Sequence, residues 1–250
     1  MEGKLKKIAA LIMFLTLTGC ATAPTGAPTE NNYVAGFNYT PPAQTKPLSS
    51  NVTFTVANAS FKTAGNLAWI TFPQFARLPD ALRQNLTDIL VAKGFGVRGP
   101  YDSYDLIPFQ DKKDIDLYAS ILFEPSIALK DQKEGLENYW GWQSPTLQTG
   151  NAEVTGTVKL ELREIATREL MWAKNIPINK IEFPYVVRIP WGKAYKPGKI
   201  YNYGPIVEGM AKGLEQQYPD IMATVYSLID PEEMLIIKKQ AQELKSKKGY

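Results

Sequence analysis

The chain has 250 residues, 44% of them hydrophobic, and its 28 Lys and Arg against 25 Asp and Glu give a formal net charge of +3. This near-balance gives no whole-domain argument for binding nucleic acid, and we expect none as a partner. There is no histidine and only one cysteine, which excludes an intramolecular disulfide, Ser-His-Asp triads, Cys-His dyads and histidine-ligated zinc.

The chain begins with the pattern of a secretory signal. Lys4, Lys6 and Lys7 form a positive region, and an apolar run follows from residue 8 to residue 17. As a helix this run would be roughly 15 Å long, about half the thickness of a bilayer core, so it is too short to span a membrane. Such a segment is typical of a signal peptide.

The signal ends in Leu17, Thr18, Gly19 and Cys20, which resemble the lipobox of bacterial lipoproteins. In those proteins diacylglycerol is attached to the cysteine thiol, the chain is cleaved just before it, and the new amine is often acylated. The alternative is an ordinary signal peptide with a chance cysteine. We expect residues 1–19 to be removed and Cys20 to anchor the mature protein in a membrane through its acyl chains, with no other cofactor.

Residues 20–50 are rich in Pro, Thr, Ala and Asn. This composition cannot bury a core, and it predicts a flexible tether that holds the folded part away from the membrane. Residues 51–250 remain, which suits a single globular domain.

The first half of this domain contains three predicted strands and one helix. Alternating apolar residues predict a strand at 51–57, and the apolar run within 66–72 predicts a second strand. A helix opens at Pro79 and has one apolar stripe, Gly94 is its expected C-terminal cap, and residues 95–98 lead into another strand.

The second half contains a hairpin and then helices. Residues 116–123 alternate as a strand, and residues 153–161 and 170–178 form a predicted hairpin. Apolar residues from 206 to 229 keep one helical phase through Pro219, which predicts one continuous helix with a kink at the proline. Asp230 caps a last helix with a basic end. The expected fold class is α+β: a single domain with an antiparallel-rich central sheet, one amphipathic helix after the second strand and two C-terminal helices.

No motif in the chain predicts catalysis. Residues 94–99 match the dinucleotide pattern GxGxxG, but they follow a helix and precede Pro100, whereas phosphate binding needs a strand before the glycines and a helix after them. There is no recognisable metal-ligand spacing or catalytic pair of acids. We therefore expect a protein that is not an enzyme and holds no metal.

Two aromatic-rich stretches are candidates for binding. Trp140 and Trp142 lie in a segment with neither strand nor helix periodicity, and residues 185–203 combine tyrosines, a tryptophan and prolines. Aromatic faces on loops suit sugar rings, partner proteins or the edge of a membrane. The alternative is that both stretches fold back and cover the sheet.

The chain also resembles the neuraminyllactose-binding hemagglutinin family, or flagellar sheath adhesins. The resemblance is carried, in the same order along the chain, by Val34–Pro41, Ala81–Val97, Asp116–Lys130 and Ala241–Lys248. It implies a lipoprotein of the outer membrane or the flagellar sheath that is named for binding sialylated glycans. The family's proposed glycan-binding element is a basic run shortly after the strand that matches residues 116–123; here that region offers Lys130 and Lys133, with acidic residues between and after them.

Two functions follow from the residues and the resemblance. The first is a surface binding protein or adhesin, with Trp140 and Trp142 stacking on a host sialoglycan and Lys130 and Lys133 attracting its carboxylate. The alternative is a non-adhesive structural lipoprotein that links the envelope or the sheath to a partner protein.

Overall fold

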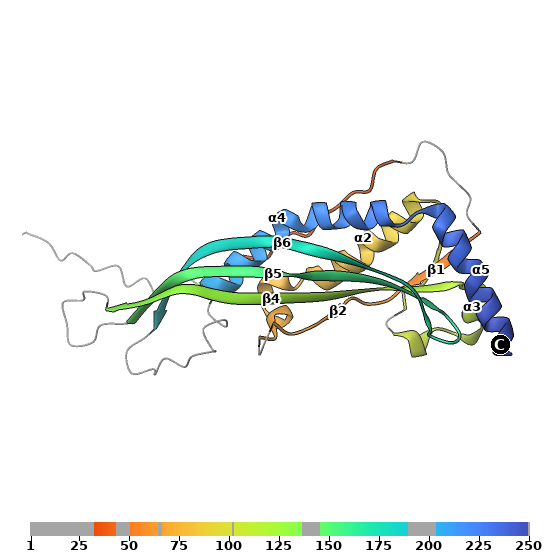
Figure 1. Cartoon of the computed structure of the whole chain (residues 1–250), viewed down its shortest axis with the longest axis horizontal. Coiled ribbons are helices and arrows are strands. Elements are labelled where there is room, and N and C mark those ends of the chain that lie inside the picture. The colour runs from red at the N-terminus through yellow and green to blue at the C-terminus, as the bar shows by residue number, and fades with distance from the viewer. Residues whose placement is uncertain are drawn as a thin grey trace, which may run out of the picture. The chain divides into compact units, whose positions relative to one another are not determined.

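The computed structural model describes residues 33–43, 51–64, 67–101, 103–136, 146–189 and 204–249. These residues form one α+β domain, as the sequence predicted (Figure 1). Its elements are β1 (Thr53–Val56), β2 (Ser60–Phe61), the 3-10 turns η1 (Trp69–Thr71) and η2 (Pro73–Phe75), α2 (Leu78–Ala92), β3 (Gly96–Arg98), η3 (Tyr104–Leu106), α3 (Phe109–Asp114), β4 (Leu117–Leu136), β5 (Thr146–Glu164), β6 (Leu170–Ile189), α4 (Gly204–Leu228) and α5 (Pro231–Lys247).

The strands form one mixed, six-stranded sheet in the order β3-β1-β4-β5-β6, with β2 paired to β4. β3, β1 and β2 are short and run parallel to their neighbours, while β4, β5 and β6 form a long antiparallel meander. The meander is the antiparallel-rich centre that the sequence predicted, and its strands of about 20 residues dominate the sheet.

The two faces of the meander differ sharply in polarity. Along β5, Val154, Val158 and Leu160 are fully buried, while the residues that alternate with them are polar and partly exposed. On the buried face, α4 packs along β6, and α2 packs near β1 and β3 (Figure 1). On the opposite side of β4, β5 and β6, η3 packs at one end, where Tyr104 meets Tyr118, and α3 lies beside η3. The rest of this side carries no helix of the described chain, and we call the whole side the open face.

Glycines allow the close approach of α4 to β6. A Cβ at Gly209 would lie 2.4 Å from the ring of Phe183, and a Cβ at Gly213 would lie 2.2 Å from Cγ2 of Ile181. In the sheet itself, Gly156 has φ +151° and faces the backbone around Pro125, where a Cβ would meet a carbonyl oxygen at 2.3 Å. These contacts leave no room for a side chain.

The predicted helices are confirmed. Gly94, at φ 84°, follows the end of α2, and α4 runs without interruption through Pro219. Asp230 caps α5 by accepting hydrogen bonds from the backbone N–H groups of Glu232 and Glu233. These ends were predictable because capping and helical phase depend on residues near in sequence.

One predicted strand is wrong, and three are too short. In the segment 66–72, Trp69–Thr71 is a 3-10 turn that buries Trp69 under Phe123, so this apolar run covers the sheet and does not extend it. β4, β5 and β6 each continue well beyond the predicted segments 116–123, 153–161 and 170–178, because their pairing continues through stretches where the apolar alternation is interrupted.

Part of the predicted tether is folded. Phe37 is 3% exposed and its ring meets Tyr218 of α4 edge-to-face at 5.3 Å, while Tyr33 and the backbone N–H of Gly36 both donate to the carboxylate of Glu215. Residues 33–43 therefore belong to the domain, and the expectation of a tether over 20–50 does not hold for them. The high Pro and Thr content of this stretch predicted a flexible tether, and composition does not show that a few aromatic side chains within it are buried.

Among the described residues, no helix is both long enough and apolar enough to cross a bilayer.

Candidate functional site

Lys130 and Lys133, the two basic candidates from the sequence, both lie on the open face. Lys130 is opposite Asn151 and Lys133 is opposite Thr149, and a register shift between the two lysines inserts one extra residue into β4. Asp131, at φ 52°, forms this bulge. Because Asn151 and Thr149 are two residues apart, the bulge brings both lysines to the same face, which the sequence alone did not predict.

Lys130 does not offer an unopposed charge. Its ammonium pairs with Glu153, whose carboxylate also lies 3.8 Å from Lys180, and Lys180 pairs in turn with Glu182 at 2.7 Å. The hydrogen bond from Lys130 is the main reason that the pKa of Glu153 is lowered. Lys133 is exposed and forms no ion pair with any described residue, so it is the freer cation of the two.

Trp140 and Trp142 lie outside the described residues, as do the lipobox residues Leu17, Thr18, Gly19 and Cys20. Of the second aromatic stretch, Tyr185 is described: it belongs to β6 and is 3% exposed on the buried face. Its ring lies over Gly150, where a Cβ would be 2.8 Å from its hydroxyl oxygen. This tyrosine covers the sheet.

At the far end of the open face from Lys130, the surface is hollowed. A cavity of about 190 Å³ is lined by Tyr118 of β4, Arg163 and Glu164 of β5, Arg168 of the turn between β5 and β6, and Tyr104 of η3. Tyr118 and Arg163 are direct partners across the two strands. We call these five residues the end pocket.

Arg168 is held in place by three groups. Its guanidinium carbon lies 3.6 Å from the centre of the Tyr104 ring, and the same guanidinium pairs with Asp105. Its carbonyl oxygen accepts a hydrogen bond from Arg163 at 3.1 Å. The buried carboxylate of Glu164 accepts from two backbone N–H groups of the turn, which fixes the loop that presents Arg168.

Arg168 also has an unusual backbone. Its φ is 61°, in the left-handed region, at a hairpin position where glycine or asparagine is the usual residue. Such a conformation costs an L residue about 1–2 kcal/mol. The local fold therefore tolerates strain at the residue whose side chain forms one wall of the end pocket.

Tyr118 supplies a hydroxyl to this pocket. Its ring meets Tyr104 edge-to-face at 5.6 Å, and its hydroxyl forms no hydrogen bond with any described residue. Burial is the largest cause of its raised pKa, and the nearby Arg168 acts in the opposite direction. The hydroxyl is thus neutral at physiological pH and can both donate and accept.

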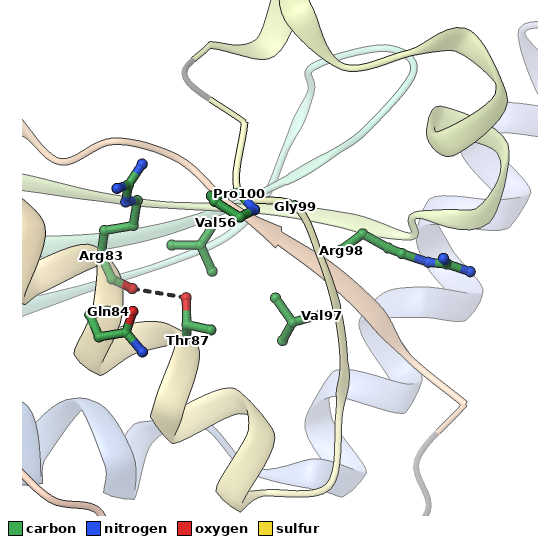
Figure 2. Close-up of a pocket in the computed structure, with 8 residues that line it drawn as sticks. All are labelled: Val56, Arg83, Gln84, Thr87, Val97, Arg98, Gly99 and Pro100. Carbon is green, nitrogen blue, oxygen red and sulfur yellow. Dashed lines mark hydrogen bonds between the residues drawn. The ribbon is translucent and has the colours of Figure 1, made fainter.

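A second cavity, of about 110 Å³, lies between α2 and the ends of β1 and β3 (Figure 2). Val56 and Val97 line it, and the hydroxyl of Thr87 donates to the carbonyl of Arg83 within its helix at 2.9 Å. The guanidinium of Arg98 points away from the hollow (Figure 2), and it lies 3.8 Å from Asp114. This cavity has few polar groups that converge, so the end pocket is the better candidate.

The end pocket has the chemistry of a binding site. Two guanidinium groups, a phenol hydroxyl and aromatic rings converge, and in the described part of the chain no group of acids is placed to hold a metal. Sequence reasoning missed this site, because its residues are spread from 104 to 168 and none stands in a motif. The arginine at the hairpin turn was the only local signal.

No family model and no curated protein matches the chain. Among solved structures, the fold is similar to that of a putative neuraminyllactose-binding hemagglutinin homolog from Helicobacter pylori, with 14% identity, 84% of this chain and 99% of that chain covered, and a TM-score of 0.57. At this identity the likeness shows a shared fold.

Two further structures are matched at lower similarity. A protein from Xanthomonas campestris has 13% identity and a TM-score of 0.34, with 84% of this chain and 98% of that chain covered. A lipoprotein from Neisseria meningitidis has 10% identity and a TM-score of 0.25, with 66% and 96% covered. TM-scores this low support no argument about function, so the shared fold with the hemagglutinin homolog is the finding that remains.

Proposed function

We propose that this protein is a lipid-anchored lipoprotein of the outer membrane or the flagellar sheath that acts as a surface binding protein or adhesin and not as an enzyme. The lipobox ending in Cys20 supports the anchor, since the only cysteine of the chain stands where acylation requires it. The fold is the one found in a protein described as a hemagglutinin homolog.

The open face is the observation that carries this proposal. It extends over three long strands, is covered within the described chain only by η3 and α3 at one end, and carries the end pocket at that end and Lys133 near the other. Exposed binding surfaces of this kind combine a few charged and aromatic groups with a rigid support. The ligand that fits the proposal is a host glycan with an acidic sugar.

Exposure at the cell surface is the first test. Intact cells are treated with a protease, and the remaining protein is measured by immunoblot against a periplasmic control protein. A surface-exposed adhesin should be degraded, whereas the periplasmic control protein should remain intact. Full retention on intact cells, with degradation after the outer membrane is opened, would contradict a surface role.

Ligand binding is the second test. The acylated full-length protein in detergent should bind sialylated glycans on an array, more weakly as salt rises. Lys133→Gln should reduce the signal more than Lys130→Gln, because the charge of Lys130 is already offset by Glu153. Trp140→Ala with Trp142→Ala should abolish the signal without lowering the melting temperature if these rings contact sugar.

The pairing of Lys130 favours a second candidate, a structural lipoprotein that links the envelope or the sheath to a partner protein. On the open face, Glu161 also bridges Lys159 at 2.6 Å and Arg163 at 2.8 Å, so many charges are satisfied within the domain. A lumen-facing scaffold would resist the protease on intact cells and would give no glycan signal.

A further inference from the structure

We propose that the end pocket binds the carboxylate-bearing terminal sugar of an acidic glycan, with Arg168 and Arg163 holding the carboxylate and Tyr118 contacting the ring and its hydroxyl groups. This inference rests on the proposed function and assigns its ligand contact to residues distinct from Lys130, Lys133 and the two tryptophans. It makes the end pocket, and not the lysine bulge, the specific part of the surface.

The size of the cavity sets the size of the ligand. Pockets that enclose a whole drug-sized molecule have volumes of about 300–1,000 Å³. The end pocket has about 190 Å³ and lies where β4 begins and β5 ends, so it admits one end group of a longer molecule. A glycan would insert its terminal residue and leave the rest of the chain along the open face.

The guanidinium groups select for a carboxylate. Arginine presents a planar fork of donors that matches a carboxylate, and Arg163 and Arg168 reach the cavity from adjacent positions. The present partner of Arg168 is Asp105, and both side chains are largely exposed, at 54% and 80%. Such an exposed pair contributes little to stability, so a ligand carboxylate can replace Asp105 at low cost.

The surrounding charges allow an anion to enter. Arg163 and Arg168 are the cations that line the pocket, and Lys112 lies 4.3 Å from the centre of the Tyr104 ring. Lys159 is counted with them because it pairs with Glu161, the partner of Arg163. The acids there are Asp105, Glu161 and Glu164. The formal balance is one positive charge, and Glu164 is buried with its carboxylate bonded to the turn.

The aromatic and hydroxyl groups select for a sugar. Sugar rings present apolar C–H faces that pack on aromatic rings, and their hydroxyl groups need partners that both donate and accept. Tyr118 provides an aromatic ring and a hydroxyl that has no partner among the described residues. A simple carboxylate such as acetate would use the arginines and leave the tyrosine without a ligand contact.

The backbone of Arg168 supports a role for its side chain. A glycine would fit φ 61° without strain, yet the chain has an arginine there. Glycine removes the contacts with Tyr104 and Asp105 in either case, and the relief of backbone strain offsets part of that loss of stability. A role for a ligand is therefore measured by the loss of binding in this variant and not by its stability.

The experiment measures binding of free sugars to the full-length acylated protein in detergent, by saturation-transfer NMR and titration. The probes are D-glucuronate and N-acetylneuraminate as acidic sugars, D-glucose as a neutral sugar, acetate as a bare carboxylate, and N-acetyl-trialanine as a peptide with a free carboxyl group. We expect the two acidic sugars to bind more tightly than the other three, with an affinity that falls as salt rises.

Three variants test the contacts. Arg168→Gly should weaken binding of the acidic sugars by about tenfold or more, since a charge-assisted hydrogen bond is lost. Tyr118→Phe should weaken it less, by a factor of about 3–10. Asp105→Asn should tighten binding, because it removes the carboxylate that competes for Arg168. Arg98→Gly is the matched control: it removes an arginine of similar exposure outside the end pocket and should leave affinity unchanged.

Each contrary outcome overturns the inference in a recognisable way. If Arg168→Gly leaves the affinity for the acidic sugars unchanged, or if Asp105→Asn weakens it, the end pocket is not their binding site. If N-acetyl-trialanine binds as tightly as the acidic sugars, the pocket recognises a peptide carboxylate and not a sugar. If no probe binds to the wild-type protein, the inference is wrong. The protease and array experiments still decide the proposed function separately, because a surface protein can bind through Lys133 or the tryptophans without using this pocket.

Discussion

Asn85 of α2 donates a hydrogen bond from Nδ2 to the hydroxyl oxygen of Tyr218 of α4, over 2.7 Å. Both side chains are buried, and they are 133 residues apart in the chain. This bond joins the two helices that cover the buried face of the sheet. It satisfies a polar amide that would otherwise be costly to bury.

Removal of this hydrogen-bond acceptor should destabilise the folded domain. Tyr218→Phe leaves the amide of Asn85 buried without its partner, and we expect the free energy of unfolding to fall by about 1–3 kcal/mol. Urea titration followed by circular dichroism measures the change. Tyr226→Phe is the control, because that hydroxyl bonds to no described residue, and it should change stability by less than about 0.5 kcal/mol. Equal effects of the two variants would contradict the role of the bond.

The same tyrosine should make the domain sensitive to alkaline pH. Burial raises the pKa of Tyr218 above its ordinary value of 10.0, so the folded state retains a proton that the unfolded chain loses. The stabilisation is complete below about pH 10 and declines as the pH rises above it. Unfolding measured from pH 8 to pH 11 should show a shallower decline in Tyr218→Phe than in the wild type. If stability falls equally steeply with pH in both proteins, titratable groups other than Tyr218 cause the decline.

The contact between α4 and β6 should be intolerant of one added methyl group. Gly213→Ala places a Cβ 2.2 Å from Cγ2 of Ile181, and such overpacking costs about 1–3 kcal/mol. Adding Ile181→Ala should restore room, so the double variant should lose less stability than the sum of the two single losses. Gly204→Ala, which meets no atom within 4 Å, serves as the control and should not destabilise. If the losses of the two single variants add in the double variant, α4 shifts to accommodate the methyl group and the contact with Ile181 does not limit the size of residue 213.

The segment around Phe37 should behave as part of the folded domain. Phe37→Ala removes a buried ring that packs on Tyr218, and we expect a loss of about 3–5 kcal/mol in the free energy of unfolding. Val34→Ala, at a residue that is 38% exposed, should cost far less. If the melting temperature is unchanged in Phe37→Ala, the segment is not packed on α4 in solution.

The lipid anchor should depend on one sulfur atom. Cys20→Ser should leave an unprocessed precursor without acyl chains, because the thiol is the group that accepts diacylglycerol. Metabolic labelling with palmitate, followed by electrophoresis, measures this. Thr22→Ser is the control and should label normally. Palmitate that persists in Cys20→Ser would contradict the lipoprotein assignment.

The sequence by itself determined the features that depend on neighbouring residues. The cap at Asp230, the continuous phase of α4 through Pro219 and the end of α2 near Gly94 are local, because each relies on residues within one or two helical turns. The hairpin between β5 and β6 was also predictable from alternation on either side of a turn.

Tertiary structure decided the rest. Trp69 reads as part of a strand, yet it leaves the sheet because the aromatic side chains around Phe123 offer it burial. The bulge at Asp131 depends on pairing with β5, and it sets which face carries Lys133. Tyr104, Tyr118 and Arg168 meet only because η3 packs on the end of the meander. Register and packing join residues far apart in sequence, and no local pattern encodes the contact that they form.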